Sequence, residues 1–270
     1  EGVPESLESA VMAHFDRMSP AVRRVLRAAS VVGDLGDIDA IRAVIDDHFD
    51  PVVTLRNAAP LVVDRDRGFA FADDGIRGTL HAALPVATRR TLHQRAAEHL
   101  LAHPFEAPSF VPRVAHHFWH ADAPAPALAW QRRAGDAARE RGASVLACEH
   151  YRKGLRMALR LDRPTDVLDL ASAAADAADR AGLADVAIEM LRVAEHVAPS
   201  ATTRADLMRR RAVQHDWLGK TSSCLRLLTR AAHSAATDAT HHRHHPDEQC
   251  NRKQRQRPQP KPRSAARDSS

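Results

Sequence analysis

The chain has 270 residues, enough for one large domain or two of ordinary size. Aromatic residues make up only 4% of it and glycines number 11, which disfavours a β-sandwich or barrel and favours a mainly α protein. No apolar run approaches the ~18–20 residues that span a bilayer, and no signal-peptide pattern is present, so we expect a cytoplasmic protein that makes no use of a membrane. The three cysteines are far apart and imply no disulfide framework.

Most of the net charge of +5 lies at the C-terminal end of the chain, and the remainder of the chain is close to neutral. Residues 238–270 contain eight basic and four acidic side chains, but no Leu, Ile, Val, Met or aromatic residue. Such a segment cannot bury enough apolar surface to offset its ordering entropy, so we predict a disordered basic tail over 237–270. Its abrupt start suggests a frameshifted or non-native end. We expect its histidines and Cys250 to chelate metal only adventitiously, because nothing would hold them in a fixed geometry.

Residues 1–87 show the order of elements found in a winged-helix domain. Ser19, Asp37 and Asp50 stand where they can cap three short helices, and Gly33 and Gly36 follow the first of these. The third helix offers a single base among apolar residues, so we do not expect it to bind nucleic acid. The predicted elements are helices over 20–32, 38–45 and 51–58, a hairpin pairing 61–63 with 69–71 through the turn 65–68, and a helix over 74–84.

Residues 88–126 are predicted to form a connector of two helices. Thr88 is expected to cap the first helix, which carries Leu92, Ala96, Leu100 and Leu101. The second contains three histidines, and the i, i+4 pair among them has a spacing used in metal sites. No Glu follows the first of these histidines, and the two aromatic residues between them are typical of a core, so a structural role is favoured over a metal site. The histidines are His116, His117 and His120.

Residues 127–236 contain a repeat that resembles the tetratricopeptide pattern, whose usual period is ~34 residues. Gly142, Gly182 and Gly219 stand 40 and 37 residues apart at predicted helix–helix turns, and we expect the extra residues to lengthen the loops between repeats. We predict three degenerate repeats, near 127–160, 167–199 and 204–236. Small and bulky residues at fixed offsets from these glycines are predicted to pack the paired helices: Gly135, Ala147, Tyr151, Ala175, Ala187, Leu191, Ala194, Cys224 and Leu228.

No catalytic motif stands out in the chain. Gly219-Lys220-Thr221 resembles the end of a phosphate-binding loop, but Gln214 occupies the position of the required upstream Gly. Asp73 and Asp74 form a pair of adjacent acids that is read as a helix cap rather than as a catalytic carboxylate pair. We therefore expect no enzyme activity, no cofactor and no structural metal in this chain.

Several segments resemble the STAND-type signalling ATPases, which include large LuxR-type regulators and the ATPase-coupled class III adenylate cyclases of actinobacteria. The resemblance implies a winged helix followed by a tetratricopeptide-like arm, placed after a nucleotide-binding module that would lie upstream of Glu1 and hold ATP or ADP with Mg²⁺. The segments that carry it are Val3–Leu7, Asp16–Pro20, Val25–Gly33, Phe69–Leu84, Arg89–His93, Ala96–Glu98, Ala115–His117, Ala127–Leu128 and Ala134–Asp136.

The resemblance also implies a function. Family members usually have a nucleotide-sensing His where Asp73 stands, and a carboxylate there would repel a diphosphate. We expect a sensor and relay arm, most simply of a LuxR-type transcriptional regulator, that binds a protein or small-molecule inducer on its repeats. The same arm of an adenylate cyclase, or a free-standing repeat scaffold, remains an alternative, and no oligomeric state is indicated.

The repeat register makes one testable prediction. Leu191→Asp places a charge where two helices are expected to meet, so it should lower helicity and the melting temperature. Circular dichroism during thermal unfolding measures both. A variant that keeps full helicity and stability would show that the register is wrong.

Overall fold

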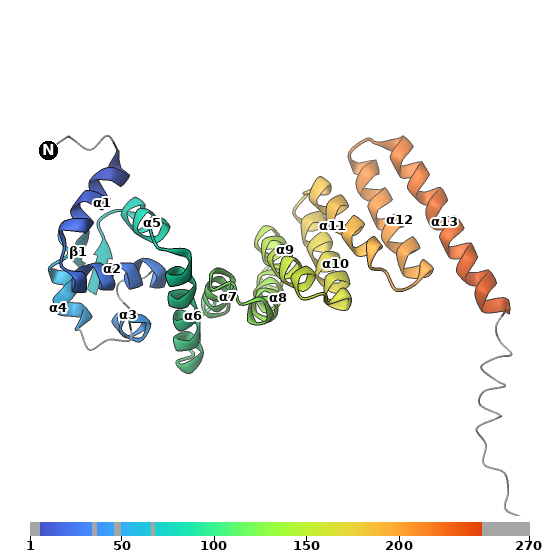
Figure 1. Cartoon of the computed structure of the whole chain (residues 1–270). Coiled ribbons are helices and arrows are strands. Elements are labelled where there is room, and N and C mark those ends of the chain that lie inside the picture. Colours follow the sequence, from blue (N-terminus) through green and yellow to red (C-terminus); the bar gives the residue numbers. More distant parts are fainter. Residues whose placement is uncertain (1–5, 34–36, 46–49, 66–67, 245–270) are drawn as a thin grey trace, which may run out of the picture. The chain divides into compact units, whose positions relative to one another are not determined.

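The computed structural model describes residues 6–33, 37–45, 50–65 and 68–244, and Figure 1 shows their elements in chain order. The mainly α fold is confirmed, because these residues form thirteen helices and one two-stranded hairpin. Internal contacts divide the chain into two compact units, Glu1–Met190 and Leu191–Ser270. No helix within the described residues is long and apolar enough to cross a bilayer.

The N-terminal elements follow the predicted winged-helix order, preceded by one further helix. Ser19 caps α2 by accepting a hydrogen bond from the Val22 amide (3.3 Å), and Asp50 caps α4 in the same way. Gly33 ends α2 with a φ of 86°. The elements are α1 (Leu7–Arg17), α2 (Pro20–Val32), α3 (Ile38–Ile45), α4 (Pro51–Arg56), β1 (Val62–Arg65), β2 (Gly68–Phe71) and α5 (Asp74–Ala82).

The hairpin closes one side of the N-terminal core. β1 and β2 are antiparallel, and Val62 pairs with Phe71. The hairpin's buried side chains join a core cluster that also contains Val25 and Leu26 of α2, which are fully buried. The predicted turn residues at 66–67, and the predicted helix-ending Gly36, lie outside the described residues.

The connector differs from its prediction at the first helix, α6 (Val86–Ala102). This helix begins two residues before Thr88, directly after Pro85, whose extended backbone sets the helix entry without a side-chain cap. The predicted Thr88 cap is therefore wrong. Of the predicted stripe, Ala96 and Leu100 are buried as expected, whereas Leu101 is 40% exposed; His93 and Ala97 complete the buried face of the helix. The second connector helix is α7 (Phe110–His120).

Six longer helices follow α7 as three hairpins. Three-residue turns at 141–143, 161–163 and 181–183 join the first four, so the turns between hairpins are as short as those within them. The predicted lengthening of the inter-repeat loops is wrong, because the additional residues extend the helices instead. The helices are α8 (Pro124–Glu140), α9 (Ser144–Arg160), α10 (Pro164–Arg180), α11 (Ala184–His196), α12 (Ala201–Trp217) and α13 (Thr221–His244).

A residue with positive φ stands in each of these three turns and in the connection between α7 and α8. Asp122, Gly142, Asp162 and Gly182 have φ values of 56°, 73°, 51° and 70°, and successive members are twenty residues apart. Each turn is closed by an amide that bonds to the carbonyl five residues earlier, as from Ala143 to Ala138 (2.9 Å). This Schellman geometry satisfies the last carbonyls of one helix while reversing the chain into the next.

The close approach of α8 and α9 depends on Gly135. A Cβ built on Gly135 would lie 2.5 Å from the Tyr151 ring, which is 1% exposed. The predicted small-against-bulky packing is therefore present in the first repeat. Of the other predicted packing residues, these are also buried: Ala147, Ala175, Ala187, Leu191 and Ala194.

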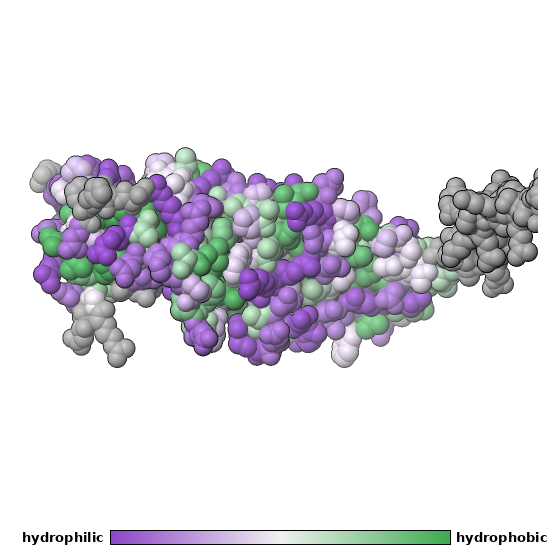
Figure 2. Space-filling view, turned by 90° about the horizontal axis from the view of Figure 1, so that it is seen from below, coloured by the Kyte–Doolittle hydropathy of each residue, from purple (hydrophilic) through white to green (hydrophobic). Residues whose placement is uncertain are grey.

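The third repeat departs from the predicted register. Leu228 is 42% exposed, whereas its neighbour Leu227 is 6% exposed and packs with α12. Cys224 is only half-buried against this same cluster. α9 is covered by both α8 and α10, whereas α13 packs on α12. Figure 2 shows apolar patches scattered among hydrophilic residues on one face of the molecule, an ordinary surface for isolated exposed side chains.

The beginning of the predicted tail is also corrected. The predicted disordered segment started at 237, but α13 continues through His244. Ala, Thr and His tolerate a helix well enough to extend one that is already nucleated. Residues 245–270 lie outside the described part of the chain.

The contact between Gly135 and Tyr151 predicts an unusual cost for alanine. Gly→Ala inside a helix normally stabilises it by about 0.5–1 kcal/mol. Gly135→Ala should instead lower the free energy of unfolding by about 1–3 kcal/mol, because its methyl group collides with a buried ring. Urea unfolding measures the change.

Gly78→Ala provides the matched control, because Gly78 lies in α5 and a Cβ there meets nothing within 4 Å. It should be neutral or stabilising. Equal effects of the two substitutions would contradict the packing described here.

Candidate functional site

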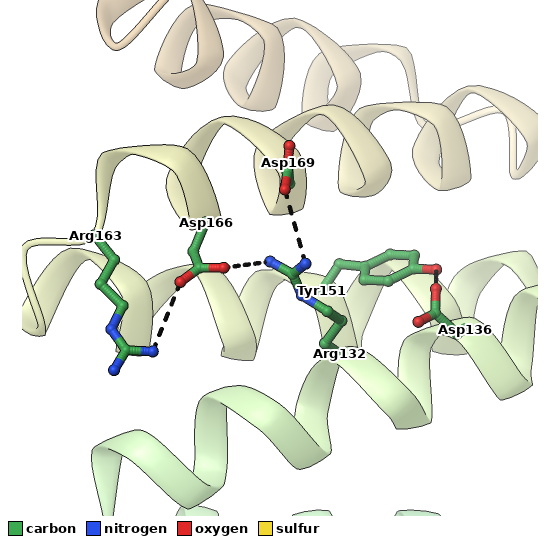
Figure 3. A network of polar contacts seen from close by, with 6 residues as sticks. All are labelled: Arg132, Asp136, Tyr151, Arg163, Asp166 and Asp169. Carbon is green, nitrogen blue, oxygen red and sulfur yellow. Dashed lines mark hydrogen bonds and ion pairs between the residues drawn. The ribbon is translucent and has the colours of Figure 1, made fainter.

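A polar network joins consecutive hairpins of the first unit (Figure 3). Arg132 of α8 bonds Asp166 of α10 at 2.7 Å and lies 3.7 Å from Asp169. Beside it, the Tyr151 hydroxyl donates to Asp136 (2.8 Å); burial and this hydrogen bond raise the pKa of Tyr151 to about 12. Since the ion pairs are partly exposed, they contribute orientation more than stability.

The second unit contains a pocket of about 580 Å³ that is rich in arginine. Four arginines and one glutamate line it, so its charged side chains carry a net charge of +3 when His196 is neutral. Its lining residues come from the end of α11 and from α12 and α13: Arg192, Glu195, His196, Arg204, Met208, Arg211 and Arg230.

A buried ion pair organises this pocket. Arg211 lies 3.2 Å from Glu195, and their side chains are 11% and 9% exposed. Burial raises the pKa of Glu195 and lowers that of Arg211, because each charged form loses water, and each group partly offsets the shift of the other. Glu195 Oε1 and Arg211 Nε have no hydrogen-bond partner among the described residues. The site therefore retains unused polar capacity at its base.

The other arginines of the pocket differ in how they are held. Arg204 donates to the carbonyls of Glu195 (3.3 Å) and Ala198 (3.4 Å), which fixes its guanidinium. Arg192 and Arg230 form no ion pair with any described residue, although both raise the local positive potential around Arg211. A carboxylate or phosphate group could accept hydrogen bonds from them in this pocket.

Five histidines gather where α5, α6 and α7 meet in the first unit. His93 is fully buried, and its two ring nitrogens face two neighbours: Nε2 lies 3.0 Å from His81 Nε2, and Nδ1 lies 2.9 Å from His117 Nδ1. The His120 ring stacks on the His93 ring with their centroids 4.9 Å apart. The centroids of the His116 and His120 rings are 4.4 Å apart. Because a neutral imidazole has one donor and one acceptor, the His81–His93–His117 chain runs in a single direction.

These rings are held neutral. Burial, with the neighbouring histidines, lowers the pKa of His93 to about 2 and that of His117 to about 3, where Arg113 also contributes. His116 keeps an exposed edge, but loss of water on its inner side, together with His120 and Lys153, lowers its pKa to about 4. The pKa values of His81 and His120 are lowered as well, chiefly by burial.

A second pocket, of about 500 Å³, adjoins this cluster and includes His81 and His120 in its lining. Asp122 bonds both Arg90 (2.6 Å) and Arg160 (2.5 Å), and the hydrogen bond from Arg160 lowers its pKa. Arg90 and Arg160 of this pocket therefore already share an internal carboxylate.

The predicted site residues fall in several separate places. Asp73 accepts a hydrogen bond from the Gly75 amide (2.6 Å), so it serves as the N-cap of α5, as favoured. Gly219 has a φ of 67° and lies in the α12–α13 turn, where the Lys220 amide bonds the His215 carbonyl. Gly142 and Gly182 also occupy turns.

Sequence reasoning found the three histidines of α7 but missed His81 and His93. His81 lies 12 residues before His93 and is contributed by another helix. The available signal was His93 itself, which falls at helical spacing with Ala96, Ala97 and Leu100 on a buried stripe. The arginine pocket was missed because its members come from three helices.

Comparisons with known proteins give few matches. No protein-family model and no curated protein matches the chain. Among solved structures, it is similar to PH0952 from Pyrococcus horikoshii, a Signal Transduction ATPase with Numerous Domains (STAND) protein with a tetratricopeptide repeat sensor, at 14% identity and a TM-score of 0.47. That match covers 88% of this chain and 35% of PH0952, so the chain spans about a third of its length. It is also similar to BtubC (BKLC) from P. vanneervenii, at 10% identity and a TM-score of 0.37, with 94% and 100% of the two chains covered.

The buried ion pair of the arginine pocket makes a direct prediction. Arg211→Ala leaves the Glu195 carboxylate buried without its partner, so it should lower the free energy of unfolding by about 3–5 kcal/mol. Adding Glu195→Gln to this variant should recover part of the loss, because the remaining group is then uncharged. Chemical denaturation measures both effects.

Arg209→Ala is the control, because Arg209 lies on the same helix and forms an exposed i, i+3 pair with Asp206. Its loss should change stability by less than ~1 kcal/mol. An Arg211→Ala variant as stable as the Arg209→Ala control would contradict the structural importance of the buried pair.

Proposed function

We propose that this chain is the non-catalytic sensor and relay arm of a STAND-type signal-transduction regulator whose output is a LuxR-type transcriptional response. The observation that carries the sensor role is the arginine-lined pocket formed by α11, α12 and α13. The sequence segments that resemble the family, and the order of a winged-helix-like domain followed by helical hairpins, support the placement of the arm.

The pocket favours an anionic inducer. Arg192 and Arg230 provide guanidinium groups that form no ion pair within the described part of the chain, and the Glu195–Arg211 pair forms a fixed polar base. Guanidinium groups bind carboxylates and phosphates through paired, directional hydrogen bonds. The proposed inducer is therefore a small molecule that bears one or more carboxylate or phosphate groups. Its negative charge would neutralise the net positive charge of the pocket.

The relay would use the N-terminal domain. In the proposed parent protein, nucleotide state in an upstream ATPase biases how this domain docks, and inducer binding on the repeats shifts the same equilibrium. ATP or ADP and Mg²⁺ would belong to that upstream module. Asp73 already caps α5, so the proposal gives it a structural role and no part in contacting nucleotide.

Ligand-induced stabilisation of the full chain tests the sensor role. A panel of di- and tricarboxylates and phosphate esters is added, and the melting temperature is recorded. At least one compound should raise it, because a ligand that binds only the folded state stabilises that state by mass action. Arg192→Ala and Arg230→Ala should each abolish the rise.

Arg209→Ala should retain the response, because this arginine lies outside the pocket and is paired with Asp206. The proposal fails if no compound in the panel stabilises the chain. It also fails if the stabilisation survives in both pocket variants.

A further inference from the structure

We propose that His93, His116 and His117 form a binding site for a divalent transition-metal ion of the zinc class. One ring nitrogen from each of the three lies within 4.8 Å of the others. The site joins α6 to α7 and is separate from the arginine pocket, which lies in the other compact unit.

The spacing of the nitrogens suits a shared ion after a small adjustment. Zinc binds imidazole nitrogen at ~2.0–2.1 Å, so ligand nitrogens in a tetrahedral site stand ~3.4 Å apart. His93 Nδ1 and His117 Nδ1 are 2.9 Å apart and need to separate slightly. The ring nitrogen of His116 needs to move closer to these two nitrogens. His116 is exposed and can turn its ring toward the ion, which also gives the ion a route from solvent.

The surroundings of His93 match those of a metal ligand. A histidine that coordinates through one nitrogen normally donates the other N–H to a fixed acceptor. If His93 Nδ1 faces the ion, His93 Nε2–H points at His81 Nε2 at 3.0 Å. His81 thereby sets the tautomer of His93 and leaves its Nδ1 lone pair toward the ion.

The charges around the cluster restrict which ion can bind. The charged groups that act on these histidines are all cationic: Arg77, Arg89, Arg113 and Lys153. Hard ions such as Mg²⁺ and Ca²⁺ require oxygen ligands and gain nothing from such a site. Zn²⁺, Ni²⁺ and Cu²⁺ form strong bonds to imidazole and can offset this repulsion. Binding would cross-link α6 and α7 at the junction between the N-terminal domain and the first hairpin.

Metal binding by the full chain tests the proposal. The background protein carries Gln in place of His241, His242, His244 and His245 and Ser in place of Cys250, so that these C-terminal side chains cannot chelate the probe. After dialysis against Zn²⁺ or Co²⁺, it should hold one ion per chain, with the visible bands of nitrogen-ligated Co²⁺ and a raised melting temperature that EDTA reverses. His116→Gln and His93→Gln should each weaken binding by at least ~10-fold.

His99→Gln is the matched control, because His99 also lies on α6 and faces His103 rather than the cluster. It should leave the stoichiometry and affinity unchanged. Because His116 is exposed, the His116→Gln variant should keep the fold. Its metal affinity therefore tests the proposal even if His93→Gln destabilises the chain. Absence of binding tighter than a Kd of ~10 µM, or binding that His116→Gln leaves intact, would overturn the proposal and leave the histidines as a hydrogen-bonded chain only.

Discussion

The helical hairpins depend on a residue that adopts a left-handed backbone between consecutive helices. Between α7 and α11 this residue recurs every twenty positions, alternately Asp and Gly, and each time the chain reverses within three residues. Gly adopts this conformation without steric cost, and Asp is among the few other residues that tolerate it. The short turns force neighbouring helices to pack along most of their length. That packing in turn requires small residues such as Gly135 wherever a ring such as Tyr151 must fit.

Two polar clusters follow from this framework, one in each compact unit. The arginine pocket draws one wall from each of α11, α12 and α13, so it exists only when the second unit is folded. The histidine cluster likewise needs α5, α6 and α7 in place. Both place titratable groups in partly dry surroundings, where an unpaired guanidinium or a neutral imidazole interacts more strongly with a ligand than it would at the surface. An inducer site and a metal site can therefore coexist on one scaffold.

Local features of the fold were predictable from the sequence, and features that depend on distant residues were not. Ser19, Asp37, Asp50 and Asp73 cap the helices that they were expected to cap, because a cap depends on neighbouring amides alone. The helix cap predicted at Thr88 was wrong because the helix begins earlier, directly after Pro85. The packing role predicted for Leu228 was wrong because its neighbour Leu227 lies on the face of α13 that packs against α12. The two polar clusters could not be predicted, because each brings together residues from three helices. The periodicity of the sequence does not specify how those helices pack against one another.

The central claim is that this chain is the arm of a STAND-type regulator, and the coding DNA on both sides of it provides the most direct test. All frames are translated upstream of Glu1 and downstream of Ser270. The account predicts a nucleotide-binding module with a phosphate loop upstream, and further helical repeats or a LuxR-type helix-turn-helix downstream. A cyclase domain upstream would contradict the transcriptional output and transfer the arm to cyclic-nucleotide signalling. A start codon directly before Glu1 and a stop after Ser270, with no such sequence in any frame, would contradict the claim itself.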